Sequence, residues 1–236
     1  QQGNPSPSVR ETLGHLKRLP TFWYASLGCG LTAFVAYGNG NFLPSLLIRN
    51  HGLSLGEVGL VLAVVAGLSG ALGTFLGGFL ADRLGVKDKR WYLWIPFWGV
   101  TLTIAPYYYG VLGDHTPTVI AGLAFASFTI SIFLGPCIAV SHSLVPPSMR
   151  ALTSAVLFFI FNMVGLGLGP FFTGILSDML IPIAGDHSLR WAMTATTSVA
   201  PLAALMFYQA SKHLSQDLER QQRYSDGPET KKTLVN

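Results

Sequence analysis

The sequence predicts an all-α membrane protein with six transmembrane helices. Half of its 236 residues are hydrophobic and only 11% are charged, against about 25% in a typical soluble domain. A soluble helical core would need a polar stripe on most of its helices. Instead, six segments contain no Asp, Glu, Lys or Arg, and each exceeds the roughly 20 residues that span a bilayer as a helix. They are residues 22–47, 58–81, 91–113, 116–141, 151–177 and 191–211.

The distribution of basic residues predicts the orientation. With six spans, 13 of the 15 Lys and Arg residues fall on one side, and only Arg49 and Arg190 lie on the other. The positive-inside rule then places both termini in the cytoplasm. The net charge of +4 therefore reflects topology, and we expect no nucleic-acid partner. Residues 212–236 are expected to form a charged cytoplasmic tail, disordered beyond Tyr224.

Residues 1–21 are expected to form a cytoplasmic linker with one short helix. Ser8 and Glu11 match a capping box, and Pro20 is expected to end the helix. An amphipathic helix at this position would lie along the membrane surface, and a fully solvated linker is the alternative. The apolar face would consist of Val9, Leu13 and Leu16.

Local sequence modifies individual spans. The first span contains Tyr37–Pro44, whose glycines, asparagines and proline predict a break or kink. The third span contains Pro96 and Pro106 and is bounded by Trp and Tyr at its two ends, as is typical of membrane-interface belts. Cys29 and Cys137 lie inside apolar spans, so we expect small buried hydrophobes rather than a disulfide or metal pair.

The second and fifth spans end in related sequences. Residues 73–82 and 169–178 are identical at five of ten positions, including their final Asp82 and Asp178. Spans three apart cross the membrane in opposite directions, which places Asp82 at the cytoplasmic face and Asp178 at the external face. Many secondary transporters are built from such inverted repeats. The two three-helix repeats would be residues 22–113 and 116–211.

Glycines cluster in the same two spans. Small residues let membrane helices approach closely, and Gly169-Pro170 also fits a helix bend that takes part in rocking. The clusters are Gly73, Gly77 and Gly78 in one span, and Gly165, Gly167 and Gly169 in the other.

The segment Gly78-Phe-Leu-Ala-Asp82-Arg83-Leu-Gly85-Val-Lys87 resembles the signature loop of the major facilitator superfamily, with Val86 where the family usually has arginine. The resemblance implies a fold of six helices as a 3+3 inverted repeat, one half of a major facilitator transporter. The position after a linker implies the carboxy-terminal half, with the amino-terminal six-helix half as partner. In the family the equivalent of Asp82 docks on a helix of the other half as part of a gate. An ordinary solvated carboxylate is the alternative. The gating motif would be Gly78, Asp82, Arg83, Gly85 and Lys87.

Three further segments are similar to the spinster-like group of this superfamily: residues 144–155, residues 162–170 and Leu176-Ser177-Asp178. That similarity implies proton-coupled export of lysophospholipid-like or sphingoid amphipathic substrates, and an integral multi-pass protein of a bacterial inner membrane or an equivalent bilayer. Export of small organic anions or drugs is the alternative. No residue pattern points to lipids independently of the resemblance.

Polar side chains within the spans are the candidates for substrate contact. Ser and Thr often bond their own helix instead, whereas an asparagine is costly to expose to lipid. No charged side chain lies inside a span, so a proton carrier would belong to the other half. We expect no catalytic residue, cofactor or metal site, because no His, Asp or Glu cluster lies at membrane depth. The signature loop also argues against an ATP-driven transporter. The substrate-binding candidates are Tyr37, Asn39, Asn41, Thr129, Ser131 and Asn162.

Overall fold

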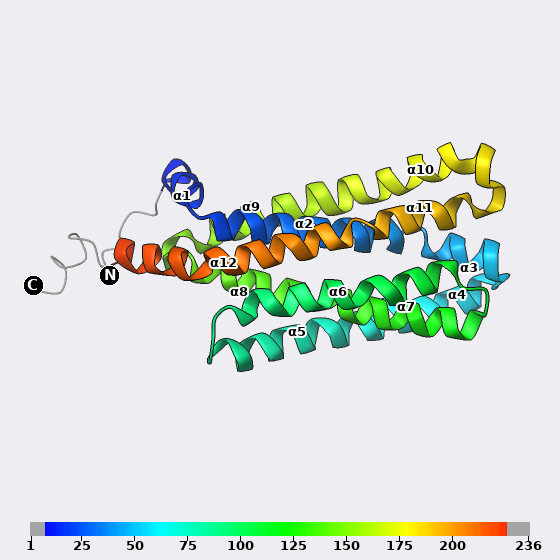
Figure 1. Cartoon of the computed structure of the whole chain (residues 1–236), viewed down its shortest axis with the longest axis horizontal. Helices are drawn as coiled ribbons and strands as arrows, with labels where there is room; N and C mark the ends of the chain where they lie inside the picture. The colour runs from blue at the N-terminus through cyan, green and yellow to red at the C-terminus, as the bar shows by residue number, and fades with distance from the viewer. Residues whose placement is uncertain (1–7, 226–236) are drawn as a thin grey trace, which may run out of the picture.

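The computed structural model describes residues 8–225, which form a short helix and six long helical rods (Figure 1). The short helix is α1 (Val9–Leu16). In chain order the rods are α2–α3 (Pro20–Gly40, Leu43–His51), α4–η1–α5 (Leu55–Leu62, Ala63–Leu68, Ser69–Gly85), α6 (Trp91–Leu112), α7–η2–α8 (Thr116–Ile130, Ser131–Phe133, Leu134–Ser143), η3–α9–η4–α10 (Pro147–Met149, Arg150–Ile160, Phe161–Leu168, Gly169–Ala184), and, after η5 (Gly185–His187), α11–α12 (Ser188–Thr197, Ala200–Ser225).

Length and hydropathy mark three helical stretches within the described part of the chain as able to cross a membrane, or four if the bent pair Val9–Leu16 and Pro20–His51 counts as one span. The longest of the three, Pro147–Tyr224, folds back at η5 so that α10 packs along α11, which makes it two rods. Helix α6 adds a rod of 22 uncharged residues, about 33 Å long at 1.5 Å per residue. Each of the six expected spans therefore coincides with one rod.

Three local expectations can be compared with the helix boundaries. The predicted break in the first span is confirmed, because α2 ends at Gly40 and α3 begins at Leu43. Pro20 does not end the short helix. Helix α1 ends at Leu16, and Pro20 opens α2, where its missing N–H is not needed. The sixth rod continues as helix from Lys212 to Ser225, and the expected disorder lies outside the described residues.

The sequence repeats are not the packing units. The first rod packs mainly against the fifth and sixth, while the fourth packs mainly against the second and third. Figure 1 shows α2, α9–α10 and α11–α12 in one layer, with α5, α6 and α7 in the other. Helices α6 and α12 join the two layers. The first rod of each repeat thus packs against the second and third rods of the other repeat. Two repeats related by a two-fold axis in the membrane plane would produce this arrangement.

Glycines create matching contacts in both repeats. A Cβ on Gly73 would overlap the carbonyl oxygen of Phe128 in the fourth rod, and one on Gly169 would lie 2.6 Å from the carbonyl oxygen of Phe34 in the first. Both helices therefore pack backbone against backbone. Gly77 and Gly165 also approach their neighbours closely. The expectation is wrong for Gly78 and Gly167, because a Cβ on Gly78 would meet nothing within 4 Å and one on Gly167 would meet only its own helix.

Both glycine-rich rods also contain a π-helical stretch. These stretches are η1 (Ala63–Leu68), which precedes Gly73, and η4 (Phe161–Leu168), which contains Gly165 and ends directly before Gly169. Short π segments within α-helices are frequent at functional sites. The π-helical stretch η4 changes to α10 at Gly169, and the expected bend at Gly169-Pro170 stays a prediction.

Cys29 and Cys137 are both buried and free, as expected for small core residues. They belong to a hydrophobic cluster that includes Phe22 and Phe207 and extends along the first, fourth and sixth rods. This cluster holds the helices that carry the candidate functional residues.

Candidate functional site

The two ends of the bundle differ in charge. One end, here called the basic end, contains α1, the α5–α6 connection, Arg150 and the end of α12. The opposite end contains the α3–α4, α6–α7 and α10–α11 connections. Figure 1 shows both ends of the described chain at the basic end. The structure thus separates the two sides that the charge count separates.

Asp82 lies in the last turn of α5 at the basic end, and its side chain is exposed. A carboxylate there is disfavoured by the helix dipole. Within residues 8–225 it forms no ion pair or side-chain hydrogen bond. The charge is therefore available to a partner outside this chain's described part.

In the rest of the signature loop, Gly85 packs closely against a neighbouring side chain and the charged residues are exposed. A Cβ on Gly85 would overlap the ring of Tyr92, so only glycine permits this contact. Asp88 accepts a 2.8 Å hydrogen bond from the N–H of Arg90 at the start of α6. The Arg83 guanidinium lies 6.0 Å from the centre of the Phe79 ring, and Lys87 is exposed. The loop is thus a tight turn that presents charges at the surface.

Two substrate-binding candidates are buried between helices. Nδ2 of Asn39 donates a 3.0 Å hydrogen bond to Thr197 Oγ1. The Oγ1 atoms of Thr129 and Thr103 are 2.8 Å apart. Both candidates therefore join helices of the bundle, and neither is exposed on the surface of this half.

The other four candidates reach the surface or its margin. Tyr37 is half-buried and packs edge-on against Phe161, with ring centres 5.9 Å apart. Asn41 is exposed directly after α2. Asn162 is exposed on η4 and donates a 2.8 Å hydrogen bond to a carbonyl of its own helix. Ser131 also bonds its own helix, at 2.7 Å. The structure brings Tyr37 and η4 together and leaves Ser131 apart on another rod.

A small pocket of about 190 Å³ lies at the opposite end, between α3 and α10. The sequence placed Arg49 and Asp178 on the same side of the membrane but did not connect them, because they lie on different rods. Both line this pocket. The remaining lining residues are Phe42, Ser45, Gly174, Ser177 and Leu189.

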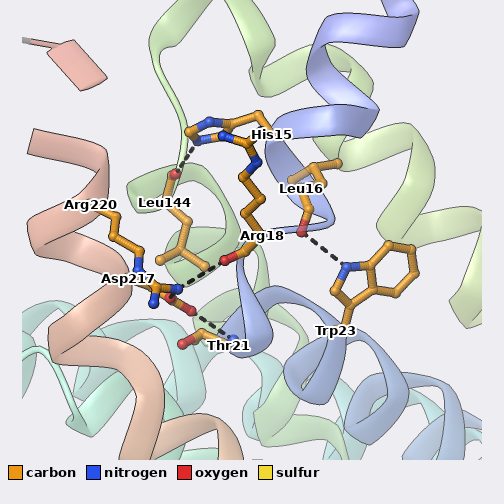
Figure 2. Close-up of polar contacts among 8 residues, drawn as sticks. All are labelled: His15, Leu16, Arg18, Thr21, Trp23, Leu144, Asp217 and Arg220. Atoms are coloured by element: carbon orange, nitrogen blue, oxygen red, sulfur yellow. Dashed lines mark hydrogen bonds and ion pairs between the residues drawn. The ribbon is translucent and has the colours of Figure 1, made fainter. Parts of the chain in front are cut away.

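Asp217 was missed by the sequence analysis because it lies in a segment interpreted as a tail. Its side chain is 1% exposed, and Oδ2 accepts a 2.9 Å hydrogen bond from the N–H of Thr21 (Figure 2). That N–H is one of the unpaired donors of the first turn of α2. Arg220 pairs with Asp217 at 3.3 Å and donates to the Arg18 carbonyl at 3.1 Å. The i,i+3 spacing of Asp217 and Arg220 could have indicated a helix with an ion pair in this segment.

Helix α1 is tied to the bundle by the same region. Trp23 Nε1 donates a 3.0 Å hydrogen bond to the Leu16 carbonyl, and His15 Nε2 lies 3.4 Å from the Leu144 carbonyl oxygen (Figure 2). Ser8 caps α1 by accepting from the N–H of Glu11. The chain turns by 91° between α1 and the first rod.

Among the described residues, no three His, Cys, Asp or Glu side chains come together as a metal site would require. The arrangement instead has a carboxylate at each end of a helical bundle, and polar side chains of the first and fifth rods between those ends. These are features suited to binding and movement rather than bond chemistry.

Comparisons with known proteins agree with this description. The sequence model of the Major Facilitator Superfamily matches residues 25–233. An MFS-type efflux pump of Mycolicibacterium smegmatis (strain ATCC 700084 / mc(2)155) is 34% identical over 213 residues, which are 89% of this chain and 49% of that protein.

The fold is also similar to a bacterial homolog of the human lysosomal transporter Spinster. Its inward-facing, unoccupied structure has a TM-score of 0.84 and 28% identity, covering 92% of this chain and 53% of that chain. The inward-facing, occupied structure has a TM-score of 0.76 and 29% identity, covering 84% and 50%. This chain thus spans about half the length of its relatives, and it belongs to the Major Facilitator Superfamily.

Proposed function

We propose that this chain is the carboxy-terminal half of an alternating-access secondary transporter, with the basic end in the cytoplasm. The observation that carries the proposal is the signature loop at that end, with an exposed Asp82 that has no partner within residues 8–225. The other half would supply that partner when the cytoplasmic side closes. Coverage of about half of each relative supports a missing half.

The proposed substrate is amphipathic, of the lysophospholipid or sphingoid type, and is exported. Similarity to a Spinster homolog supports the first part, and similarity to an efflux pump supports the second. The efflux relative equally favours a second candidate, export of small organic anions or drugs. Proton coupling would use groups of the other half, because none of the six expected spans contains Asp, Glu, His, Lys or Arg.

Substrate contact is proposed for the surface where the first and fifth rods meet. Tyr37, Asn41 and Asn162 are the residues of that surface. Ser131 is retained as a candidate on the fourth rod. Asn39 and Thr129 would act indirectly, by holding helices together through their bonds to Thr197 and Thr103.

The test replaces Asp82 by Asn in the full-length transporter that contains both halves. Losing one charge-assisted contact, worth about 1.5–3 kcal/mol, should shift the outward-open to inward-open ratio roughly ten-fold or more toward inward-open. Transport should fall while binding persists, since the binding surface lies several turns away. Binding is measured with a lysophospholipid and with a small organic anion, which separates the two substrate classes.

Asp88→Asn is the matched control, because it makes the same change in the same loop and keeps the acceptor oxygen that bonds the Arg90 N–H. It should transport like the parent protein. Normal transport by Asp82→Asn, or loss of binding together with transport in a folded protein, would show that Asp82 is not a gate.

A further inference from the structure

Arg49 and Asp178 are oppositely charged side chains on the walls of one pocket, and each has no partner in the part of the chain that the structure describes. Both side chains are exposed. The other arginine at this end behaves differently, because Arg190 is buried and pairs with Asp114 at 2.9 Å. The opposite end therefore contains one satisfied pair and one unsatisfied, separated pair.

Asp178 is the structural counterpart of Asp82, beyond the shared sequence. Nine residues before Asp82, a Cβ on Gly73 would overlap the carbonyl oxygen of Phe128 in the fourth rod. Nine residues before Asp178, a Cβ on Gly169 would lie 2.6 Å from the carbonyl oxygen of Phe34 in the first rod. The two aspartates thus follow equivalent helix contacts at opposite ends of the bundle.

The pocket is smaller than the usual site for a whole organic ligand. Its volume of about 190 Å³ compares with roughly 300–1,000 Å³ for typical ligand sites. An entering protein side chain matches this volume better than a drug-sized molecule does. Its two charges call for a donor opposite Asp178 and an acceptor opposite Arg49.

We propose that this pocket is an outer gate, in which Asp178 and Arg49 receive the external end of the transporter's other half when the external side closes. The proposal rests on the proposed function and adds a partner to it. Contacts made in only one of two states stabilise that state. Asp82 would stabilise the outward-open state by closing the cytoplasmic side, and the Asp178 pocket would stabilise the inward-open state by closing the external side.

The experiment uses the full-length transporter with its natural cysteines replaced and a reporter cysteine introduced as Ser45→Cys. Ser45 is partly exposed in this half and lines the pocket, so external closure should cover it. The rate of labelling by an impermeant thiol reagent from outside then reports the outward-open fraction. Asp82→Asn should lower this rate, because it favours the inward-open state. Adding Asp178→Asn to that inward-biased variant should raise the rate again about ten-fold.

Two controls keep the outcome decisive. Asp186→Asn makes the same change at the same end but outside the pocket, and should not alter labelling. Asp178→Glu keeps the charge and should label at nearly the parent rate, which covers the case in which Asp178→Asn fails to fold.

An unchanged or lower labelling rate when Asp178→Asn is added to folded Asp82→Asn would overturn the proposal, as would a large change in Asp178→Glu. Weaker substrate binding by Asp178→Asn with unchanged labelling would identify a substrate subsite and also overturn it. Failure of the proposed function is distinct, because it would appear as an absent Asp82→Asn effect or as no transport by the parent protein.

Discussion

Arg190 joins the start of α11 to the α6–α7 connection. Its side chain donates a 2.9 Å hydrogen bond to Asp114 and a 3.1 Å hydrogen bond to the Gly113 carbonyl. Its side chain is 9% exposed, whereas that of Asp114 is 90% exposed. The hydrogen bond from Arg190, and then its positive charge, lower the pKa of the Asp114 carboxyl. Screening by water keeps the energetic effect of this pair small.

A lowered carboxyl pKa determines the sign of the pH dependence. The stabilisation from Asp114 is fully present above the unfolded pKa of about 3.9, and it is lost as the pH falls through the lower folded pKa. Asp114→Asn should therefore melt at a lower temperature than the parent protein at pH 7, with the difference disappearing in strongly acidic buffer. Thermal unfolding followed from pH 7 to pH 3 measures this. Asp186→Asn, in the neighbouring connection, should show no such pH-dependent difference. If both variants showed the same pH dependence, the effect could not come from the pair of Asp114 with Arg190.

At this scale the sequence predicted residue type better than residue role. Glycines at 73, 77, 165 and 169 were expected at close contacts, and the structure confirms each of them. Asn39 and Thr129 were expected to contact substrate, which stays a prediction, and the structure shows both side chains bonded to neighbouring helices. The reason is that a residue's role depends on the rotation of its helix about the helix axis. Composition shows that a polar residue lies in a span but not which neighbour it faces.

At the scale of elements, α1, α2 and α12 form one assembly at the basic end. Pro20 begins α2, so the next residue, Thr21, presents an N–H that no residue within α2 can accept. Asp217 of α12 accepts it across 196 positions of sequence. A carboxylate is well suited to this place, because the amino-terminal end of a helix carries partial positive charge.

Asp217→Ala should loosen the junction of α1 and the first rod. The change removes an acceptor for a buried N–H and an ion pair with Arg220, and hydrogen bonds to charged groups contribute about 1.5–3 kcal/mol. We expect faster amide exchange at Thr21 and easier proteolytic cleavage between α1 and α2. Glu219→Ala, which removes an exposed carboxylate from the same helix turn, should leave both unchanged. Equal exchange in the two variants would mean that Asp217 does not hold this junction.

At the scale of the whole molecule, the charge distribution and the arrangement of the rods assign the connections to the same two ends of the bundle. The α5–α6 connection and both ends of the described chain share the basic end, while the α6–α7 and α10–α11 connections share the other. If the protein had the opposite orientation in the membrane, all of these segments would change sides together. Labelling one connection at each end therefore determines the orientation.

A cysteine at position 186 should react with an impermeant thiol reagent from outside the cell, and one at position 89 should react only after the membrane is opened. Cys29 and Cys137 are fully buried and would be replaced by Ala to remove background. The physical reason is the positive-inside rule, which applies to short connections such as residues 86–90. Labelling of position 89 in intact cells would reverse the proposed orientation and, with it, the assignment of inner and outer gates.

The sequence by itself determined the six spans, the family and the presence of an inverted repeat, because each depends on composition or on residues adjacent in the chain. A bilayer forces uncharged stretches of sufficient length to become helices, so the spans follow without knowledge of their neighbours. Only the tertiary structure decided which rods pack together, and therefore that Arg49 and Asp178 line one pocket, that Asp217 bonds Thr21 and that Arg190 pairs with Asp114. These residues are far apart in the sequence. Their proximity depends on the rotation of each helix about its own axis, which the uniformly apolar surface of a membrane helix does not reveal.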